Sequence, residues 1–148
     1  MTSFIFDAGA LSLFYAEDER LRPLVDKIQG ERDRGLLSSV TLSEFYYKTC
    51  QNLGRDVANL WCRQLNERIQ VVGADIDLSL SAGLEKCKNS SLSLADTYAL
   101  ALTKRVGRIL LTTDSELARS RESRVRYFKV RASGGRASGG SNTPRGTV

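Results

Sequence analysis

The sequence contains no histidine, and this absence excludes several classes of enzyme at once. Ser-His-Asp and Cys-His nucleophiles, ribonuclease mechanisms that depend on histidine, and histidine-ligated metals all require an imidazole. Carboxylates are therefore the side chains left for acid–base or metal chemistry.

Cysteine is also scarce. The three cysteines, Cys50, Cys62 and Cys87, have no CxxC spacing and cannot all pair with one another. Without histidine to complete a ligand set, this pattern argues against a disulfide scaffold and against a zinc site. We expect three small core residues, and a bridge between Cys50 and Cys62 stays open as an alternative.

Long hydrophobic runs are missing as well. No apolar run reaches the roughly 20 residues that a membrane-spanning helix needs, and the apolar first sixteen residues contain Asp7 and lack the basic leader of a signal peptide. With 148 residues, 41% of them hydrophobic, the chain is long enough for one domain with a sizeable core. We expect a soluble, cytoplasmic protein that does not associate with membranes.

Short apolar segments alternate with helical patterns through residue 130. The expected strands lie at residues 3–6, 36–40, 69–74 and 106–113, with a last edge strand within 124–130. Such alternation predicts an α/β fold with a mainly parallel central sheet and helices on both faces, in which ligands bind at the carboxyl ends of the strands. Three acids fall at such ends: Asp7, Glu44 and Asp114.

The composition changes after residue 130. Residues 131–148 contain a tandem RASGG, no acid and almost no apolar side chain, so they cannot form part of a core. We therefore divide the chain into a domain, residues 1–130, and a disordered basic tail, residues 131–148.

A strip of basic residues precedes and enters this tail. Glu122 is the one acid among residues 119–136, which include Arg119, Arg121, Arg124, Arg126, Lys129, Arg131 and Arg136. Such a strip suits a phosphate backbone, with Arg119, Arg121 and Arg124 as candidate RNA contacts. The alternative is an ordinary solvated basic face.

A fourth acid, Asp96, lies in the segment SLADTYALAL, whose helical pattern is apolar nearly all round. If Asp96 converges with Asp7, Glu44 and Asp114, four like charges would repel one another unless a divalent cation binds there. Ligation by oxygen alone points to Mg²⁺ or Mn²⁺. A metal in such a site can activate a water that attacks a phosphodiester, as in acid-only nucleases.

A simpler interpretation of the acids is helix capping. Ser93 with Asp96, Thr41 with Glu44 and Thr113 with Glu116 each match the capping-box pattern, and Asp7 could be an N-cap. Capping does not require an acid at each of these places, so the joint occurrence after strands still favours a shared site.

Four ordered segments, FIFDAGAL, TLSEFYYK, SLADTYALAL and LLTTDSEL, resemble the acidic motifs of the PIN domain, above all those of the VapC-type toxin ribonucleases of VapBC toxin–antitoxin pairs. The resemblance runs from about residue 2 to residue 130 and implies a PIN-like three-layer α/β/α sandwich. It further implies that four acids bind the metal and are catalytic: Asp7, Glu44, Asp96 and Asp114. By the same resemblance, the Thr112 hydroxyl supports the site and Glu116 is an additional metal-binding acid. Gly9 stands where that family frequently has serine or threonine.

By this resemblance the protein is an Mg²⁺- or Mn²⁺-dependent endoribonuclease toxin that hydrolyses RNA through a metal-activated water. The implied partners are RNA, a VapB-like antitoxin and a second copy of the chain in a homodimer. Trp61 and the aromatic residues of EFYYK are candidate contacts to the antitoxin; alternatively, they are core residues. Two alternatives stay open: a PIN-fold RNA-processing nuclease that is not a toxin, and a catalytically inert RNA-binding module. A dehalogenase-type phosphatase is disfavoured because position 9, two residues after Asp7, is glycine.

Overall fold

The computed structural model describes residues 1–65, 67–106, 108–119 and 124–130; the predicted tail and Arg121 lie outside these ranges. In chain order the elements are β1 (Ser3–Phe6), α1 (Ala8–Tyr15), a 3-10 helix (Glu19–Leu21), α2 (Arg22–Gln29), β2 (Arg34–Ser38), α3 (Ser39–Leu53), α4 (Arg55–Leu65), β3 (Ile69–Val72), α5 (Ile76–Lys88), α6 (Leu94–Val106), β4 (Ile109–Thr112), α7 (Ser115–Ala118) and β5 (Arg124–Tyr127).

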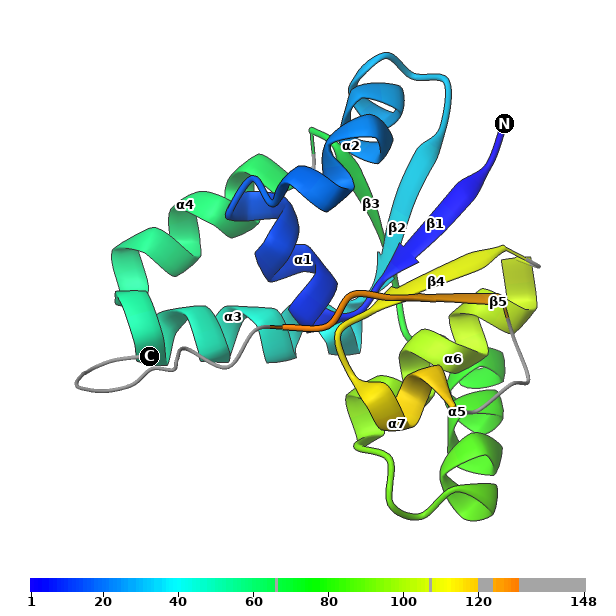
Figure 1. The fold of residues 1–148 in the computed structure, drawn as a ribbon. Coiled ribbons are helices and arrows are strands. Elements are labelled where there is room, and N and C mark those ends of the chain that lie inside the picture. The colour runs from blue at the N-terminus through cyan, green and yellow to red at the C-terminus, as the bar shows by residue number, and fades with distance from the viewer. Residues whose placement is uncertain (66, 107, 120–123, 131–148) are drawn as a thin grey trace.

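The strands form one sheet in the order β3-β2-β1-β4-β5, and all four pairings are parallel. The predicted edge strand is therefore confirmed as β5. Successive strands run outward from β1 through β2 to β3, after which the chain returns to the other side of β1 with β4 (Figure 1). In sheets of this kind, the crevice at which the strand order reverses is the usual ligand site, and here it lies between β1 and β4.

Each face of the sheet carries its own hydrophobic core, because successive strand residues point to opposite sides. Phe4, Phe6 and Leu37 pack with α1, α2 and α4, whereas Ile5 and Leu36 pack with α5, α6 and α7. Figure 1 shows the two helical layers on either side of the sheet. The predicted three-layer α/β/α sandwich is confirmed.

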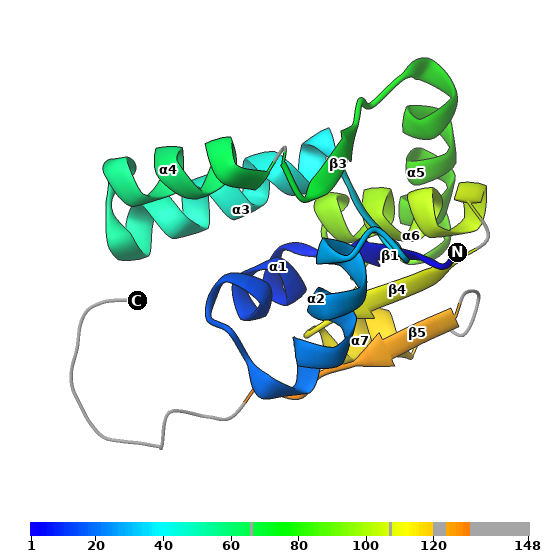
Figure 2. The same cartoon turned by 90° about the horizontal axis from the view of Figure 1, so that it is seen from above.

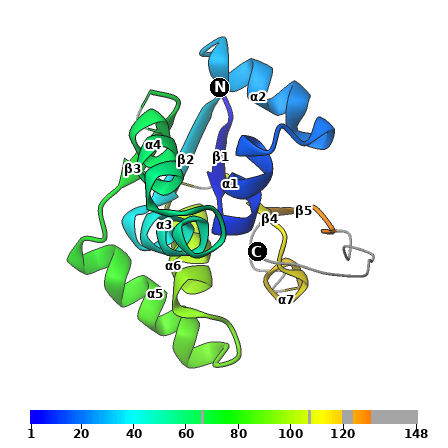
Figure 3. The ribbon, with the colours of Figure 1, turned by 90° about the vertical axis from the view of Figure 1, so that its left-hand side faces the viewer.

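Helices α3 and α4 form an antiparallel pair that extends away from the sheet (Figure 2). Gly54 joins them with φ +94°, a conformation that favours glycine. Viewed from the left-hand side of Figure 1, α3 lies between α1 and α6 (Figure 3), and it contacts both helices. This position brings side chains of α3 to the carboxyl edge of the sheet.

The predicted end of the second strand was wrong by two residues. Strand β2 ends at Ser38, whose hydroxyl accepts a hydrogen bond from the Thr41 amide at 3.0 Å, so that α3 already begins at Ser39. The N-cap of α3 is therefore Ser38, and the alternative interpretation of Thr41 and Glu44 as a capping box is not supported.

The three cysteines are free thiols in the structure, and the expectation of three core residues is wrong, because Cys50 and Cys62 are only partly buried and Cys87 is exposed. Among the described helices, none combines the length and the apolar composition needed to cross a membrane.

Candidate active site

Asp7 occupies the junction between β1 and α1. Its carboxylate caps α1 by accepting a hydrogen bond from the Ala10 amide at 2.7 Å, and the Thr112 hydroxyl donates a second. Its backbone amide donates to the Leu111 carbonyl of β4 at 3.1 Å. Burial, with a smaller contribution from the charge of Asp96, raises the pKa of Asp7 to about 6, although hydrogen bonds from Thr112 and from the backbone of Ala10 and Thr113 lower it.

Asp96 lies in the first turn of α6 and forms the predicted capping box. Its amide donates to the Ser93 hydroxyl at 3.1 Å, and its carboxylate accepts from the Ser93 amide at 3.4 Å. Burial raises the pKa of Asp96; the Ser93 hydrogen bonds oppose this, while the charges of Asp114 and Glu44 add to it. Asp96 therefore caps its helix and also faces other acids.

Asp114 follows β4 and is the N-cap of α7, where it accepts hydrogen bonds from the amides of Glu116 at 2.8 Å and Leu117 at 3.0 Å. The alternative interpretation, a capping box between Thr113 and Glu116, is not supported, because Asp114 is the N-cap of α7. The amide of Asp114 donates to the Thr112 hydroxyl oxygen at 2.9 Å. Because the same hydroxyl donates to the Asp7 carboxylate, Thr112 links this carboxylate to the backbone of Asp114.

Glu44 projects from α3 with its side chain 15% exposed, and the Lys48 ammonium group one turn later lies 3.2 Å from its carboxylate. Partial burial alone would lower the pKa of Lys48. The negative charges of Glu44 and Asp96 contribute to a larger opposite effect, so the pKa of Lys48 is raised overall. Lys48 therefore sits in the electrostatic field of two of the predicted site acids.

All four predicted acids line one cavity of about 200 Å³, which we call the acid cavity. Its walls are Asp7, Ala8, Gly9, Glu44, Lys48, Ser93, Asp96, Thr113 and Asp114. The cavity lies where β1 and β4 end, which is the crevice at which the strand order reverses. The convergence inferred from four separate motifs is thus present in the fold.

A family model of the PIN domain matches residues 4–122. The chain belongs to the PIN-domain family.

Solved structures agree with this assignment at the level of the fold. DNA-bound VapBC from Salmonella typhimurium matches with 17% identity and a TM-score of 0.68, over 86% of this chain and 98% of that one. VapBC2 from Rickettsia felis bound to a promoter DNA fragment matches with 12% identity and a TM-score of 0.64, over 86% and 100%. VapC20 from Mycobacterium tuberculosis, a Sarcin-Ricin loop cleaving toxin, matches with 17% identity and a TM-score of 0.59, over 79% and 93%. The sequence has no significant match among curated proteins.

The donor set of this PIN domain suits a hard divalent cation. Four carboxylates from four separate parts of the chain share the acid cavity, and no thiol or imidazole accompanies them. A cation would offset the burial and mutual repulsion that raise the pKa values of Asp7 and Asp96. Within the described ranges, no three acidic or cysteine side chains are grouped as a ready metal site, so closure around an ion requires side-chain movement.

The other predicted site residues lie outside the acid cavity. The Glu116 carboxylate accepts a hydrogen bond from the Ser91 hydroxyl and is not part of the cavity wall. Arg119 is exposed at the end of α7. Arg124 is also exposed, but it pairs with Ile109 at the start of β4, three residues before the end of that strand. Arg124 is therefore at the edge of the sheet opposite the acids, and Arg121 lies outside the described residues.

Sequence reasoning missed several cavity residues. Lys48 had a readable signal, because it follows Glu44 by four residues and so shares its helix face. The contact between Gly9 and Thr113 had no such signal: a Cβ at Gly9 would lie 1.8 Å from the Thr113 hydroxyl oxygen and 3.0 Å from its Cβ. Thr113 thus fills the space that a side chain at position 9 would need.

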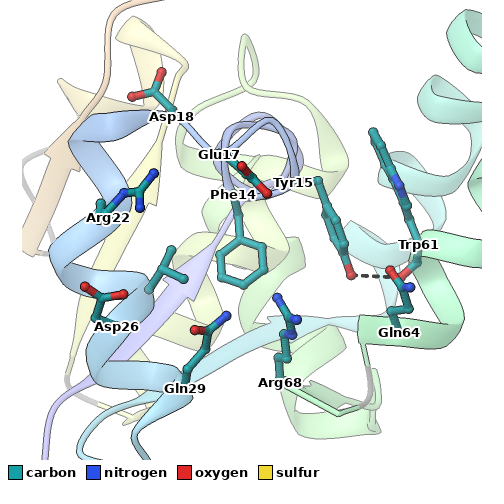
Figure 4. Close-up of a pocket in the computed structure, with 11 residues that line it drawn as sticks. Phe14, Tyr15, Glu17, Asp18, Arg22, Asp26, Gln29, Trp61, Gln64 and Arg68 are labelled. Carbon is teal, nitrogen blue, oxygen red and sulfur yellow. Dashed lines mark hydrogen bonds between the residues drawn. The ribbon is translucent and has the colours of Figure 1, made fainter.

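A second cavity, of about 410 Å³, lies between α1, α2 and α4 (Figure 4). We call it the aromatic cavity, because Phe14, Tyr15 and Trp61 line it together with the charged residues Glu17, Asp18, Arg22, Asp26 and Arg68. The rings of Tyr15 and Trp61 stack with centroids 5.0 Å apart, and the Tyr15 hydroxyl donates to the Trp61 carbonyl at 2.8 Å. Burial raises the pKa of Tyr15 to about 12.

Proposed function

We propose that this PIN domain is an Mg²⁺- or Mn²⁺-dependent endoribonuclease and the toxin of a cytoplasmic toxin–antitoxin pair. The observation that carries the proposal is the convergence of Asp7, Glu44, Asp96 and Asp114 on one cavity at the carboxyl edge of the sheet. Membership in the PIN family and a fold shared with VapC toxins support it.

In this proposal the four acids coordinate the metal, and hydrogen bonds from neighbouring residues orient the carboxylates. A bound Mg²⁺ or Mn²⁺ would lower the pKa of a coordinated water and neutralise charge that develops on the phosphodiester. Thr112 and the Ala10 amide fix the Asp7 carboxylate, and Ser93 fixes that of Asp96. These hydrogen bonds preorganise two of the four acids, and the other ligands would reach the ion by side-chain movement. Glu116 is the further acid that we expect to assist, reached through a change of side-chain rotamer.

Basic residues of α7 and β5 are the proposed contacts to RNA. Arg119 ends the short helix that Asp114 begins, so it lies within two turns of a cavity acid. Arg124, at the opposite edge of the sheet from the acids, would contact a part of the RNA that lies away from the cavity, together with Arg126. Phosphate contacts of this kind give binding that weakens as salt increases. We therefore expect Arg119→Gln to weaken binding of a single-stranded oligonucleotide, as measured by fluorescence anisotropy at several salt concentrations.

The proposed protein partner is a VapB-like antitoxin. Several matching structures are toxin–antitoxin complexes, among them those from Salmonella typhimurium and Klebsiella pneumoniae. Of the aromatic candidates, Phe45 is 1% exposed and belongs to the core, whereas Tyr47 is 49% exposed. Trp61 is partly buried and lines the aromatic cavity. We expect Trp61 and the aromatic cavity to contact the antitoxin.

A homodimer is the proposed assembly, and α5 offers a surface for it. Ile76, Leu80 and Leu84 are spaced four residues apart, so they form one stripe along this helix, and they are 78%, 69% and 59% exposed. An exposed apolar stripe of this kind marks an interaction site. We expect Leu80→Glu to lower the sedimentation coefficient from that of a dimer to that of a monomer without loss of helical circular dichroism.

The deciding experiment is cleavage of a single-stranded oligonucleotide and a structured RNA by the full-length protein with Mg²⁺, Mn²⁺ or EDTA. We expect metal-dependent cutting that Asp96→Asn abolishes. The matched control is Asp56→Asn, which changes the same charge at an exposed position in the first turn of α4. Cutting that EDTA leaves unchanged, or equal cutting by Asp96→Asn, would contradict the proposal.

One observation favours a second candidate, the inert RNA-binding module: Asp7, Asp96 and Asp114 all cap helices, so each has a structural role without a metal. This candidate predicts salt-sensitive RNA binding without cleavage in any metal. An RNA-processing nuclease instead predicts cleavage without growth arrest on expression, whereas a toxin arrests growth.

A further inference from the structure

Lys48 is the one basic side chain among the described residues that line the acid cavity. Its ammonium group lies 3.2 Å from the Glu44 carboxylate, on the cavity side of α3. The cavity therefore contains four carboxylates and a single positive charge, which the chain itself supplies.

An ordinary surface pair between residues four apart on a helix contributes only about 0.3–0.5 kcal/mol. Glu44 differs from that case because its side chain is 15% exposed and because Asp96 also acts on Lys48. The Lys48 side chain itself is 56% exposed. A long, half-exposed lysine can leave its partner by rotation of its own side chain, without movement of α3.

We infer that Lys48 is a resident counter-ion that competes with the divalent cation for Glu44 and thereby sets the metal affinity of the site. This inference rests on the proposed function. Without metal, Lys48 offsets the repulsion among the four acids. When a cation binds, its positive charge and that of Lys48 repel each other, and the Glu44 oxygen that holds Lys48 becomes a metal ligand only after the ammonium group moves away.

The test is the affinity of the full-length protein for Mn²⁺ without RNA, measured by titration calorimetry. We expect Lys48→Gln to bind Mn²⁺ roughly tenfold more tightly than the parent protein, because a nearby positive charge is lost. Lys48→Arg keeps the charge and should stay within about twofold of the parent. Lys27→Gln, an equal charge change at an exposed position of α2, is the matched control and should also stay within about twofold.

A second measurement covers the metal-free state. In EDTA we expect Lys48→Gln to unfold at a lower temperature than Lys27→Gln. We also expect added Mn²⁺ to raise the unfolding temperature of Lys48→Gln by more than it raises that of the parent.

Equal Mn²⁺ affinities of Lys48→Gln and Lys27→Gln would overturn the inference while leaving the proposed function intact. Absence of Mn²⁺ binding in the parent and in every variant, or binding that Asp96→Asn does not weaken, would overturn both.

Discussion

The acid cavity and the aromatic cavity lie at opposite ends of the same short helix. Asp7, Ala8 and Gly9 at the start of α1 line the first, and Phe14 and Tyr15 at its end line the second. The helix dipole favours negative charge at the start of α1 and positive charge at its end. The acid cavity concentrates carboxylates with one lysine, whereas the aromatic cavity combines acids with Arg22 and Arg68 around stacked rings.

The different side chains of the two cavities indicate that one cavity serves chemistry and the other serves stability. Like charges in a confined space cost folding free energy and are retained where they bind something. The stacked rings of the aromatic cavity, in contrast, stabilise the fold by themselves. Substitution of an acid in the acid cavity should therefore lower activity without unfolding the domain, whereas substitution of a stacked ring in the aromatic cavity should lower stability.

The largest expected effect is that of Asp7→Asn on cleavage. Asparagine can still cap α1, so the fold should persist, but the loss of a metal-binding charge should reduce the cleavage rate by roughly 100- to 1,000-fold. The measurement is the single-turnover rate on an oligonucleotide with Mn²⁺. Asp26→Asn, in the aromatic cavity, should keep the parent rate. A rate of Asp7→Asn above half of the parent rate would remove the functional distinction between the two cavities.

The pH dependence of stability sharpens the comparison further. The folded-state pKa of Asp7, about 6, lies above its ordinary value of 3.8, so as pH rises the unfolded chain releases this proton first. The contribution of Asp7 to the free energy of unfolding thus falls between about pH 4 and pH 6, by up to about 3 kcal/mol, and then stays level. Asp96 acts in the same direction.

Chemical unfolding in EDTA at a series of pH values measures this effect. Relative to the parent, Asp7→Asn should gain stability across that window, because it has no proton to lose. A constant difference between the two proteins from pH 4 to pH 7 would show that the Asp7 carboxylate is not destabilised by its surroundings.

In the aromatic cavity, Trp61→Ala should lower the free energy of unfolding by about 2–3 kcal/mol, since it removes the stack on Tyr15 and a contact of the core. The milder Tyr15→Phe, which loses the hydrogen bond to the Trp61 carbonyl, should cost about 1 kcal/mol. Urea unfolding measures both. Cleavage by the folded fraction should match the parent, and a parallel loss of cleavage would mean that the two cavities are coupled through α1.

The smallest effect concerns the wall of the acid cavity. Gly9→Ala should improve helix propensity, but its Cβ would overlap Thr113, so we expect a net loss of about 1 kcal/mol. Thr113→Ala removes the nearest atom, and the double variant should recover part of that loss. A double-mutant cycle in urea measures the coupling. An increase in stability from Gly9→Ala alone would show that Thr113 moves aside freely.

Much of the fold could be predicted because short apolar strand segments alternate with helical patterns along the sequence. In β1, Phe4 and Phe6 face one core and Ile5 the other, so the whole strand is buried and reads as a short apolar run between polar residues. The end of β2 was misplaced because Ser38 and Thr41 both suit an N-cap, and the choice between them depends on where the chain leaves the sheet.

Asp7, Asp96 and Asp114 could be predicted because each follows a local signal, either a strand end or a helix start. The expected position of Glu44 at a strand end was wrong, because it lies in the second turn of α3, after β2 has ended at Ser38. The contact between Gly9 and Thr113 could not be predicted, because it joins residues of separate loops and leaves no pattern in either. The same holds for the aromatic cavity, whose Tyr15 and Trp61 are 46 residues apart and meet only after α4 packs against α1.

The hydrogen bond from Thr112 to Asp7 spans 105 residues, and it has a consequence for the protein during its synthesis. A chain that is still growing on the ribosome carries Asp7 from the outset, but it lacks Thr112 and Asp114 until nearly all of the domain has been made. Contacts of such long sequence separation form late in folding. The nascent chain therefore remains without an assembled acid cavity until β4 has emerged and paired with β1, so any activity of this cavity begins only when translation of the domain is almost complete.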